Sequence, residues 1–145
     1  MFLASRVASR WLREARQRRL TLYHGTKADK AAAILQRGFD LTLIKPRWTN
    51  DYAVSTLTTP RSIQKYFGDR PDTAIIEMTF NGNIITPEEA SLITGFSNTP
   101  QSYARALLKE GVDAVMLNGA GAKQVYVYNV KALSNIHMWA ADSAA

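Results

Sequence analysis

A strand, a histidine-glycine turn and a helix follow one another directly near the start of this chain. Leu20–His24 alternates as a short strand, Lys27–Gln36 has an alanine-rich helical pattern, and Gly38 is typical of a helix end. His24 offers a side-chain hydrogen-bonding group, and Gly25 beside it lets a flat ligand approach the backbone closely. The same residues also suit an ordinary strand-to-helix turn whose histidine is hydrogen-bonded in the core. Both interpretations stay open on this stretch alone.

The rest of the chain continues with short strands and helices that do not alternate regularly. Strands are predicted at 54–58, 73–80, 84–86, 112–117, 124–129 and 136–139, the last as a strand or tail, and helices at 61–67, from 87 and at 101–110. Asn81-Gly82-Asn83 is a turn signal between two of these strands. This order predicts an α+β fold with a mainly antiparallel sheet system. With 145 residues, 46% of them hydrophobic, the chain suits one compact domain.

The residue composition excludes several classes of site. The chain has no cysteine and only two histidines, so we expect neither a disulfide framework nor a thiolate metal site, and no metal cofactor. No apolar run reaches the roughly 18 residues that a membrane-spanning helix needs, and the N-terminus lacks the apolar core of a secretory signal. We therefore expect a soluble chain whose compartment stays open, with the cytoplasm or a virion favoured.

The basic character belongs to one end of the chain. Residues 1–19 hold six arginines and one acidic residue, so they carry +5 of the formal charge of +6. The high pI is therefore no sign of a nucleic-acid-binding core. Within residues 2–16, apolar side chains recur at helical spacing and arginines occupy much of the remaining circumference. We predict a basic amphipathic N-terminal helix over residues 1–19, followed by a single domain over residues 20–145.

This N-terminal helix has four interpretations. It could anchor the protein on anionic lipid, serve as an arginine-rich import presequence, or dock the domain onto a larger assembly or acidic partner. It could also pack its Trp11 stripe on its own domain and leave its arginines in water.

Four motifs in the remaining chain occur in a recognisable order. They are Leu22-Tyr23-His24-Gly25-Thr26 with a helix ending Arg37-Gly38-Phe39, Ser55-Thr56-Leu57-Thr58-Thr59-Pro60 with a helix reaching Tyr66, Gly111-Val112-Asp113-Ala114-Val115, and Lys123-Gln124-Val125-Tyr126-Val127-Tyr128-Asn129. With these motifs, residues 20–139 resemble the ADP-ribosyltransferase superfamily, which includes diphtheria-type toxins and poly(ADP-ribose) polymerases. The resemblance implies split antiparallel β-sheets with flanking helices around a cleft for NAD. It also implies a site unlike a Rossmann domain, whose glycine-rich fingerprint is missing from this sequence.

The resemblance assigns roles to individual residues. His24 matches the family histidine that hydrogen-bonds the ribose next to nicotinamide, and the backbone of Gly25 matches the partner of the carboxamide. Thr56, or Ser55 with a one-residue shift, stands where the diphtheria-type branch has a stacking tyrosine, while Tyr66 matches a second aromatic beside the same ring. Tyr23 and Thr26 complete the expected NAD-binding set. Trp48 or Tyr52 could supply the missing stacking face.

Gln124 is the main departure from the family pattern, because it stands at the position of the catalytic glutamate. Glutamine keeps hydrogen bonds but brings no charge to the developing positive sugar, and losing one such partner typically costs about 3–4 kcal/mol of barrier. The triad therefore has a hybrid composition, His24, Ser55 or Thr56, and Gln124. The cholera-toxin-like branch shares a Ser-Thr motif but has arginine where His24 stands.

These features give three hypotheses for function. The first is an NAD-dependent mono-ADP-ribosyltransferase that cleaves the nicotinamide–ribose bond and passes ADP-ribose to a protein or nucleic-acid acceptor. The second is a catalytically weak or inactive module of the same fold, acting as a structural or binding component of a larger assembly such as a phage particle. A tRNA 2′-phosphotransferase shares the His-Gly-Thr element, but the arginines that surround its phosphate have no obvious counterparts here.

Overall fold

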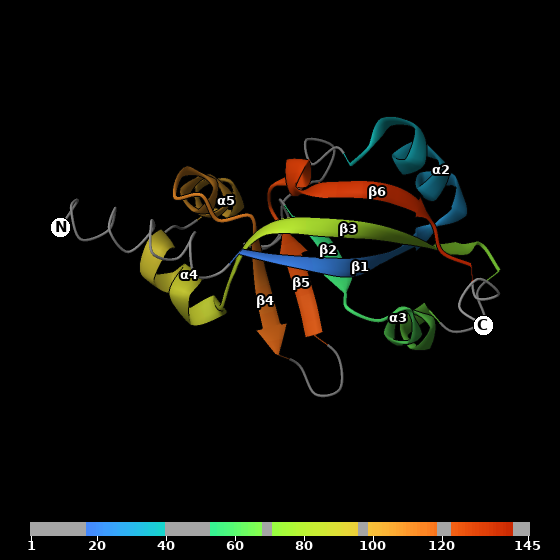
Figure 1. The fold of residues 1–145 in the computed structure, drawn as a ribbon, viewed down its shortest axis with the longest axis horizontal. Helices are drawn as coiled ribbons and strands as arrows, with labels where there is room; N and C mark the ends of the chain where they lie inside the picture. The colour runs from blue at the N-terminus through green and yellow to red at the C-terminus, as the bar shows by residue number, and fades with distance from the viewer. Residues whose placement is uncertain (1–16, 40–52, 68–70, 96–98, 119–122, 141–145) are drawn as a thin grey trace.

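The computed structural model describes residues 17–39, 53–67, 71–95, 99–118 and 123–140, excluding the side chains of Tyr66, Phe67, Pro100 and Asn118. In chain order the elements are β1 (Gln17–Lys27), α2 (Ala28–Arg37), β2 (Val54–Leu57), α3 (Pro60–Phe67), β3 (Thr73–Ile85), α4 (Pro87–Thr94), α5 (Pro100–Lys109), β4 (Ala114–Asn118), β5 (Lys123–Val127), the 3-10 turn η2 (Val130–Ala132) and β6 (Leu133–Met138) (Figure 1). This mixture of one sheet and several helices confirms the α+β class.

The strands are hydrogen-bonded in the order β1-β2-β5-β4-β3-β6, and β1 also pairs with β3. The first five strands of that order therefore close a ring, and β6 extends it from β3. Pairing is antiparallel throughout the described strands, apart from a short parallel contact of β3 with β4 at Ile84 and Ile85. The prediction of mainly antiparallel pairing is confirmed.

The ring consists of two halves that cross steeply: β1 and β3 form one half, and β2, β5 and β4 form the other. In Figure 1, β1, β3 and β6 run across the view, whereas β4 and β5 run down it. β1 pairs with β3 along its whole length, but within the described residues it meets β2 only where Tyr23 lies opposite Leu57. The two halves therefore separate on either side of that contact, and the separation leaves room for a pocket.

Alternating side chains build the main core between the halves. Leu22 of β1 lies opposite Met78 of β3, and Ile76 and Phe80 point the same way, all of them at most 1% exposed. Ala31 of α2 and Val125 and Val127 of β5 pack against them. A second cluster joins α4 and α5 to the other face of β4; it includes Ala90, Leu107, Val115 and Tyr128.

The turn predicted at Asn81-Gly82-Asn83 is wrong, because β3 runs through these residues without a break. Gly82 is needed there for another reason. A Cβ atom at position 82 would lie 2.5 Å from Oδ2 of Asp113, and that same oxygen accepts a hydrogen bond from the backbone N–H of Asn83 at 2.7 Å. The glycine therefore permits a carboxylate to approach the strand rather than allowing the chain to reverse.

The N-terminal boundary also differs from the prediction. β1 begins at Gln17, and residues 17–19 pair with Asn81, Gly82 and Asn83, so these three residues belong to the sheet. The predicted helix over residues 2–16 lies outside the described residues. No helix in the described part of the chain is long and apolar enough to cross a membrane.

Other local predictions are confirmed. α2 ends at Arg37 and is followed by the predicted Gly38, whose φ of 81° lies in the left-handed region that suits glycine. α3 starts at Pro60, one residue before the predicted start, and α4 starts at the predicted residue 87, where Thr86 forms a capping box with Glu89. The last segment, predicted as a strand or tail, is strand β6.

Candidate functional site

A pocket of about 220 Å³ lies where β1 and β2 meet. Its lining residues come from β1, β2, α3 and β5; they are Tyr23, His24, Gly25, Ser55, Thr56, Leu57, Ile63 and Gln124. Three motifs that are far apart in the sequence, those around residues 24, 55 and 124, therefore contribute to one cavity. The pairing of Leu57 with Gln124 brings the second and third of them together.

His24 is held by contacts on two sides. Its Nδ1 atom lies 2.7 Å from the carbonyl oxygen of Ser55, so Nδ1–H donates this bond and Nε2 is left as an acceptor in the neutral ring. The ring of Phe39 meets the imidazole edge-on, with centroids 5.4 Å apart and an angle of 85° between the planes. Burial lowers the pKa of His24, and the hydrogen bond to Ser55 opposes part of that effect. The imidazole is therefore neutral at pH 7.

The neighbours Ser55 and Thr56 face opposite ways, as successive residues of a strand do. Thr56 is 1% exposed, and its hydroxyl donates a hydrogen bond of 2.7 Å to the backbone oxygen of Val125. Ser55 is exposed. The hydroxyl proton of Thr56 is thus used to join β2 to β5, and Ser55 carries the accessible hydroxyl of this motif.

Gln124 is exposed at the start of β5 and contributes the pocket's side-chain amide. The other predicted site residues are placed less centrally. Thr26 pairs with Ala74 and is not among the lining residues. Tyr66 lies in α3, but its side chain is outside the described part of the structure, as are Trp48 and Tyr52.

Sequence reasoning missed three residues that shape the site. Leu57 and Ile63 line the pocket, and Phe39 orients the histidine ring. The alternation of β2 could have indicated Leu57, since it shares a face with Ser55. The other two contacts depend on how α3 and the end of α2 pack, which no local pattern records.

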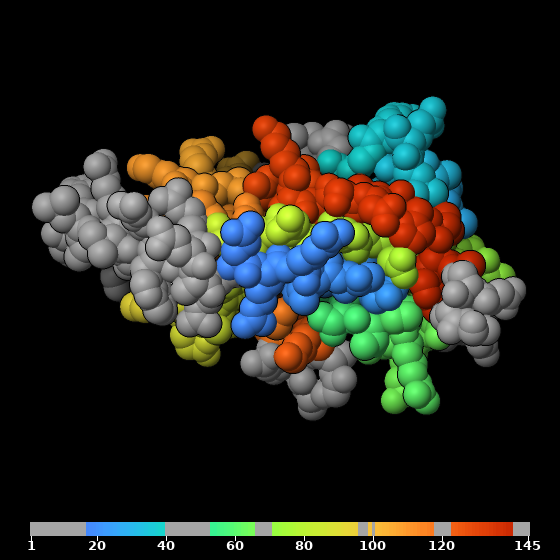
Figure 2. Space-filling view, in the orientation of Figure 1, coloured from blue at the N-terminus to red at the C-terminus, as the bar shows by residue number. Residues whose placement is uncertain are grey.

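Three polar residues form a row across β1, β3 and β6, strands whose atoms are visible in blue, yellow-green and red on the face toward the viewer in Figure 2. Tyr23, Glu77 and His137 lie opposite one another on the three strands. Glu77 is hydrogen-bonded to Tyr23 and lies 2.7 Å from Nε2 of His137. Burial raises the pKa of Tyr23, and the charge of Glu77 and the hydrogen bond to it raise that pKa further, so Tyr23 remains a neutral donor.

The pocket itself is nearly uncharged. None of its lining residues is acidic or lysine or arginine, and His24 is neutral at pH 7. Within the described residues no group of three or more His, Cys, Asp or Glu side chains could hold a metal ion. The arrangement suits a planar, polar, uncharged ligand group that exchanges hydrogen bonds with an imidazole, an amide and backbone atoms.

No protein-family model and no curated protein matches this chain.

Proposed function

We propose that this protein binds NAD through its nicotinamide end and acts as a mono-ADP-ribosyltransferase. The observation that carries the proposal is the convergence of His24, Ser55 and Gln124 in one pocket. The family resemblance assigns these positions to a single site, although 31 residues separate the first from the second along the chain. The steeply crossing halves of the strand ring are also in keeping with the split sheets that the resemblance implies.

The size of the pocket suits part of NAD rather than the whole molecule. Sites for complete drug-sized ligands have volumes of about 300–1,000 Å³. A cavity of about 220 Å³ fits a nicotinamide ring and part of its ribose, while the rest of the dinucleotide would lie outside it. The backbone of Gly25 would pair with the carboxamide, since no side chain keeps the amide away there.

His24 would position the ribose. Because Nδ1–H is bound to Ser55, the free Nε2 atom accepts a hydrogen bond, and a ribose hydroxyl is a suitable donor. The side chain of Gln124 would hold a second hydroxyl or the incoming nucleophile. In the reaction the C1′–nitrogen bond breaks, nicotinamide leaves with the bonding pair, and an acceptor atom bonds to C1′ and releases its proton to water.

Slow catalysis is expected, since the pocket holds no carboxylate among its lining residues. A preorganised negative charge would stabilise the positive sugar of the transition state, and Gln124 offers only a dipole. The same observation favours the second candidate function, a module that binds NAD or a similar ligand without turning it over. The two functions share the pocket and differ in nicotinamide release.

The deciding experiment combines thermal shift with chromatography of free nicotinamide. We expect millimolar NAD to raise the melting temperature, because a ligand bound only by the folded state stabilises it, and we expect nicotinamide to be released slowly. His24→Ala should remove both effects. Gln36→Ala, at an exposed position of α2, is the matched surface control and should change neither. Stabilisation without release would support the binding module, and no response to either NAD or nicotinamide would refute both functions.

Labelled NAD and a cell lysate would then identify the acceptor. Transfer of the adenylate-labelled half to protein or to nucleic acid is expected for a transferase. Release of free ADP-ribose alone would indicate hydrolysis.

A further inference from the structure

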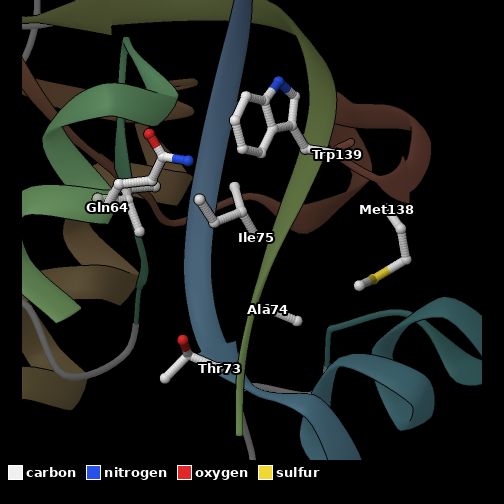
Figure 3. A pocket seen from close by; sticks show the side chains of 7 residues that line it. Gln64, Thr73, Ala74, Ile75, Met138 and Trp139 are labelled. Carbon is white, nitrogen blue, oxygen red and sulfur yellow. The ribbon is translucent and has the colours of Figure 1, made fainter. Parts of the chain in front are cut away.

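A second cavity, of about 320 Å³, lies between α3 and the adjoining ends of β3 and β6 (Figure 3). Its lining residues are Ile63, Gln64, Thr73, Ala74, Ile75, Met138 and Trp139. Ile63 lines both this cavity and the His24 pocket, and the other lining residues differ. None of the functional roles assigned above uses it.

The backbone fixes the position of the indole at this cavity. The N–H of Trp139 donates a hydrogen bond of 2.9 Å to the carbonyl oxygen of Ile75, so Trp139 continues the pairing of β6 with β3. Gly25 lies opposite Ile75 on β1 and offers no side chain beside it. The space over Ile75 is therefore bounded by Trp139 on one side and by α3 on the other.

Two side chains extend into this space from opposite sides. In Figure 3 the amide of Gln64 and the indole of Trp139 point toward one another above Ile75. Neither the amide nor the indole N–H has a hydrogen-bond partner among the residues that the structure describes. A flat aromatic surface and an amide with both donor and acceptor atoms are thus left for a ligand.

The lining also limits the charge of that ligand. None of the cavity's described lining residues is ionised at pH 7, so a phosphate, carboxylate or guanidinium group would find no opposite charge. Ile63 and Ile75 add apolar contact. An uncharged ring with polar edges satisfies both the apolar and the hydrogen-bonding parts of the lining.

We propose that this cavity binds a nucleobase, with adenine as the best fit. The base would stack on the indole of Trp139, a contact that every base can make through its π-face. The amide of Gln64 would pair with the base edge, and Gln forms two hydrogen bonds with N6 and N7 of adenine. The volume of about 320 Å³ has room for one base together with its ribose.

The base could come from a dinucleotide or from a nucleic-acid strand, and competition distinguishes these sources. If adenosine competes with NAD, the cavity takes the second base of the dinucleotide. If adenosine and NAD bind together, and a short deoxyadenosine oligonucleotide displaces adenosine, the base belongs to a strand. Both results support a nucleobase site, which stands whether or not the protein cleaves NAD.

Tryptophan fluorescence tests the proposal directly. The chain has three tryptophans, so a variant with Trp11→Phe and Trp48→Phe retains Trp139 as its only indole. Adenosine should quench this emission saturably, and ribose should not. Gln64→Ala should weaken adenosine binding several-fold, whereas Gln36→Ala, an exposed glutamine on α2, should leave it unchanged.

Isothermal titration calorimetry on the full chain measures adenosine binding to variants that lack the Trp139 fluorophore. Trp139→Leu should weaken adenosine binding at least about fivefold, the lower end of the stacking contribution of one base. Trp139→Phe should recover part of the loss, and circular dichroism would check that each variant is folded. Quenching that rises linearly without saturation, or equal affinity in folded Trp139→Leu protein, would overturn the proposal.

Discussion

The imidazole Nδ1 of His24 donates a hydrogen bond of 2.7 Å to the backbone oxygen of Ser55. This contact joins β1 to β2 close to the point where the two strands meet, and it fixes both the orientation and the tautomer of the ring. Because Nδ1 carries the proton, Nε2 of the neutral ring is a hydrogen-bond acceptor. A backbone partner at Nδ1 makes the histidine a fixed part of the pocket rather than a mobile side chain.

We predict that His24 makes stability depend on pH. Burial lowers its pKa in the folded state below the ordinary 6.5, so the unfolded chain binds more protons between those two values. The free energy of unfolding should therefore be highest above pH 6.5, fall as the pH drops through 6.5, and level off below the folded pKa. Urea unfolding of the wild type and His24→Asn at several pH values measures this.

The free energy of unfolding of His24→Asn should depend less on pH between the folded and the unfolded pKa of His24. His137, the other histidine of the chain, is present in both proteins, so the comparison isolates the effect of position 24. Identical profiles would mean that His24 is as accessible to protons in the folded protein as in the unfolded chain.

A second prediction separates the two hydroxyls of β2. Thr56→Val removes the hydrogen bond to Val125 and should lower the free energy of unfolding by about 1–2 kcal/mol. NAD binding per folded molecule should stay close to wild type. Ser55→Ala should change stability by less than about 0.5 kcal/mol, because the side chain is exposed. Thermal and urea unfolding with NAD titration give these quantities. Loss of NAD binding in folded Thr56→Val protein would assign the ligand contact to Thr56.

A third prediction concerns Gly82 and Asp113. Alanine at position 82 would press against the Asp113 carboxylate, which also accepts a hydrogen bond of 2.8 Å from the side chain of Asn129. Gly82→Ala should therefore destabilise the fold by roughly 1–3 kcal/mol, although alanine in a strand is otherwise favoured over glycine.

A double-mutant cycle tests this cause. Asp113→Ala alone should cost about 2–4 kcal/mol, since it removes charged hydrogen bonds to Asn83 and Asn129. Once Asp113 is alanine, Gly82→Ala should cost little more. Strictly additive losses would show that the carboxylate is not what position 82 must accommodate.

Asp113 also shows what the sequence could reveal and what it could not. Caps, glycines and alternation are local signals, so the sequence predicts most helices and strands to within a few residues. The role of Asp113 depends on Asn83, 30 residues earlier, and on Asn129, 16 residues later. Such contacts between distant residues follow from the closed ring of strands, which no local pattern encodes.

The same reason explains which parts of the candidate site the sequence can indicate and which it cannot. The resemblance predicts roles for His24 and Gln124, and both residues line one pocket, while the roles themselves stay predictions. The choice between Ser55 and Thr56 stayed open until the pairing with β5 fixed which side chain is buried. The turn predicted at Asn81-Gly82-Asn83 is wrong because glycine serves turns and close approaches equally well.

A fourth prediction restores a charge to the pocket. Gln124→Glu should raise the rate of nicotinamide release by at least about tenfold, since a carboxylate there would stabilise the positive sugar of the transition state. Gln124→Ala should lower the rate less than His24→Ala does. Gln36→Glu on α2 adds the same charge elsewhere and should have no effect. Unchanged release in both Gln124 variants would exclude this side chain from the reaction.

The last prediction concerns where the basic N-terminal segment ends and the domain begins. Residues 17–19 pair with Asn81, Gly82 and Asn83, so deleting residues 1–16 removes four arginines and one acid without removing any described part of the sheet. We expect this truncation to keep the melting temperature and any NAD binding. The truncated protein should no longer be retained on heparin or on anionic vesicles. Retention of the full-length protein should weaken with salt, because exposed charges are screened over about 8–10 Å.

Deleting residues 1–19 should lower the melting temperature as well, since it also removes three paired residues of β1. A full-length variant with Arg6, Arg10, Arg13 and Arg16 replaced by glutamine separates charge from length, and it should lose retention while keeping its stability. If the shorter truncation fails to fold, the segment packs on the domain and its arginines are only a solvated face.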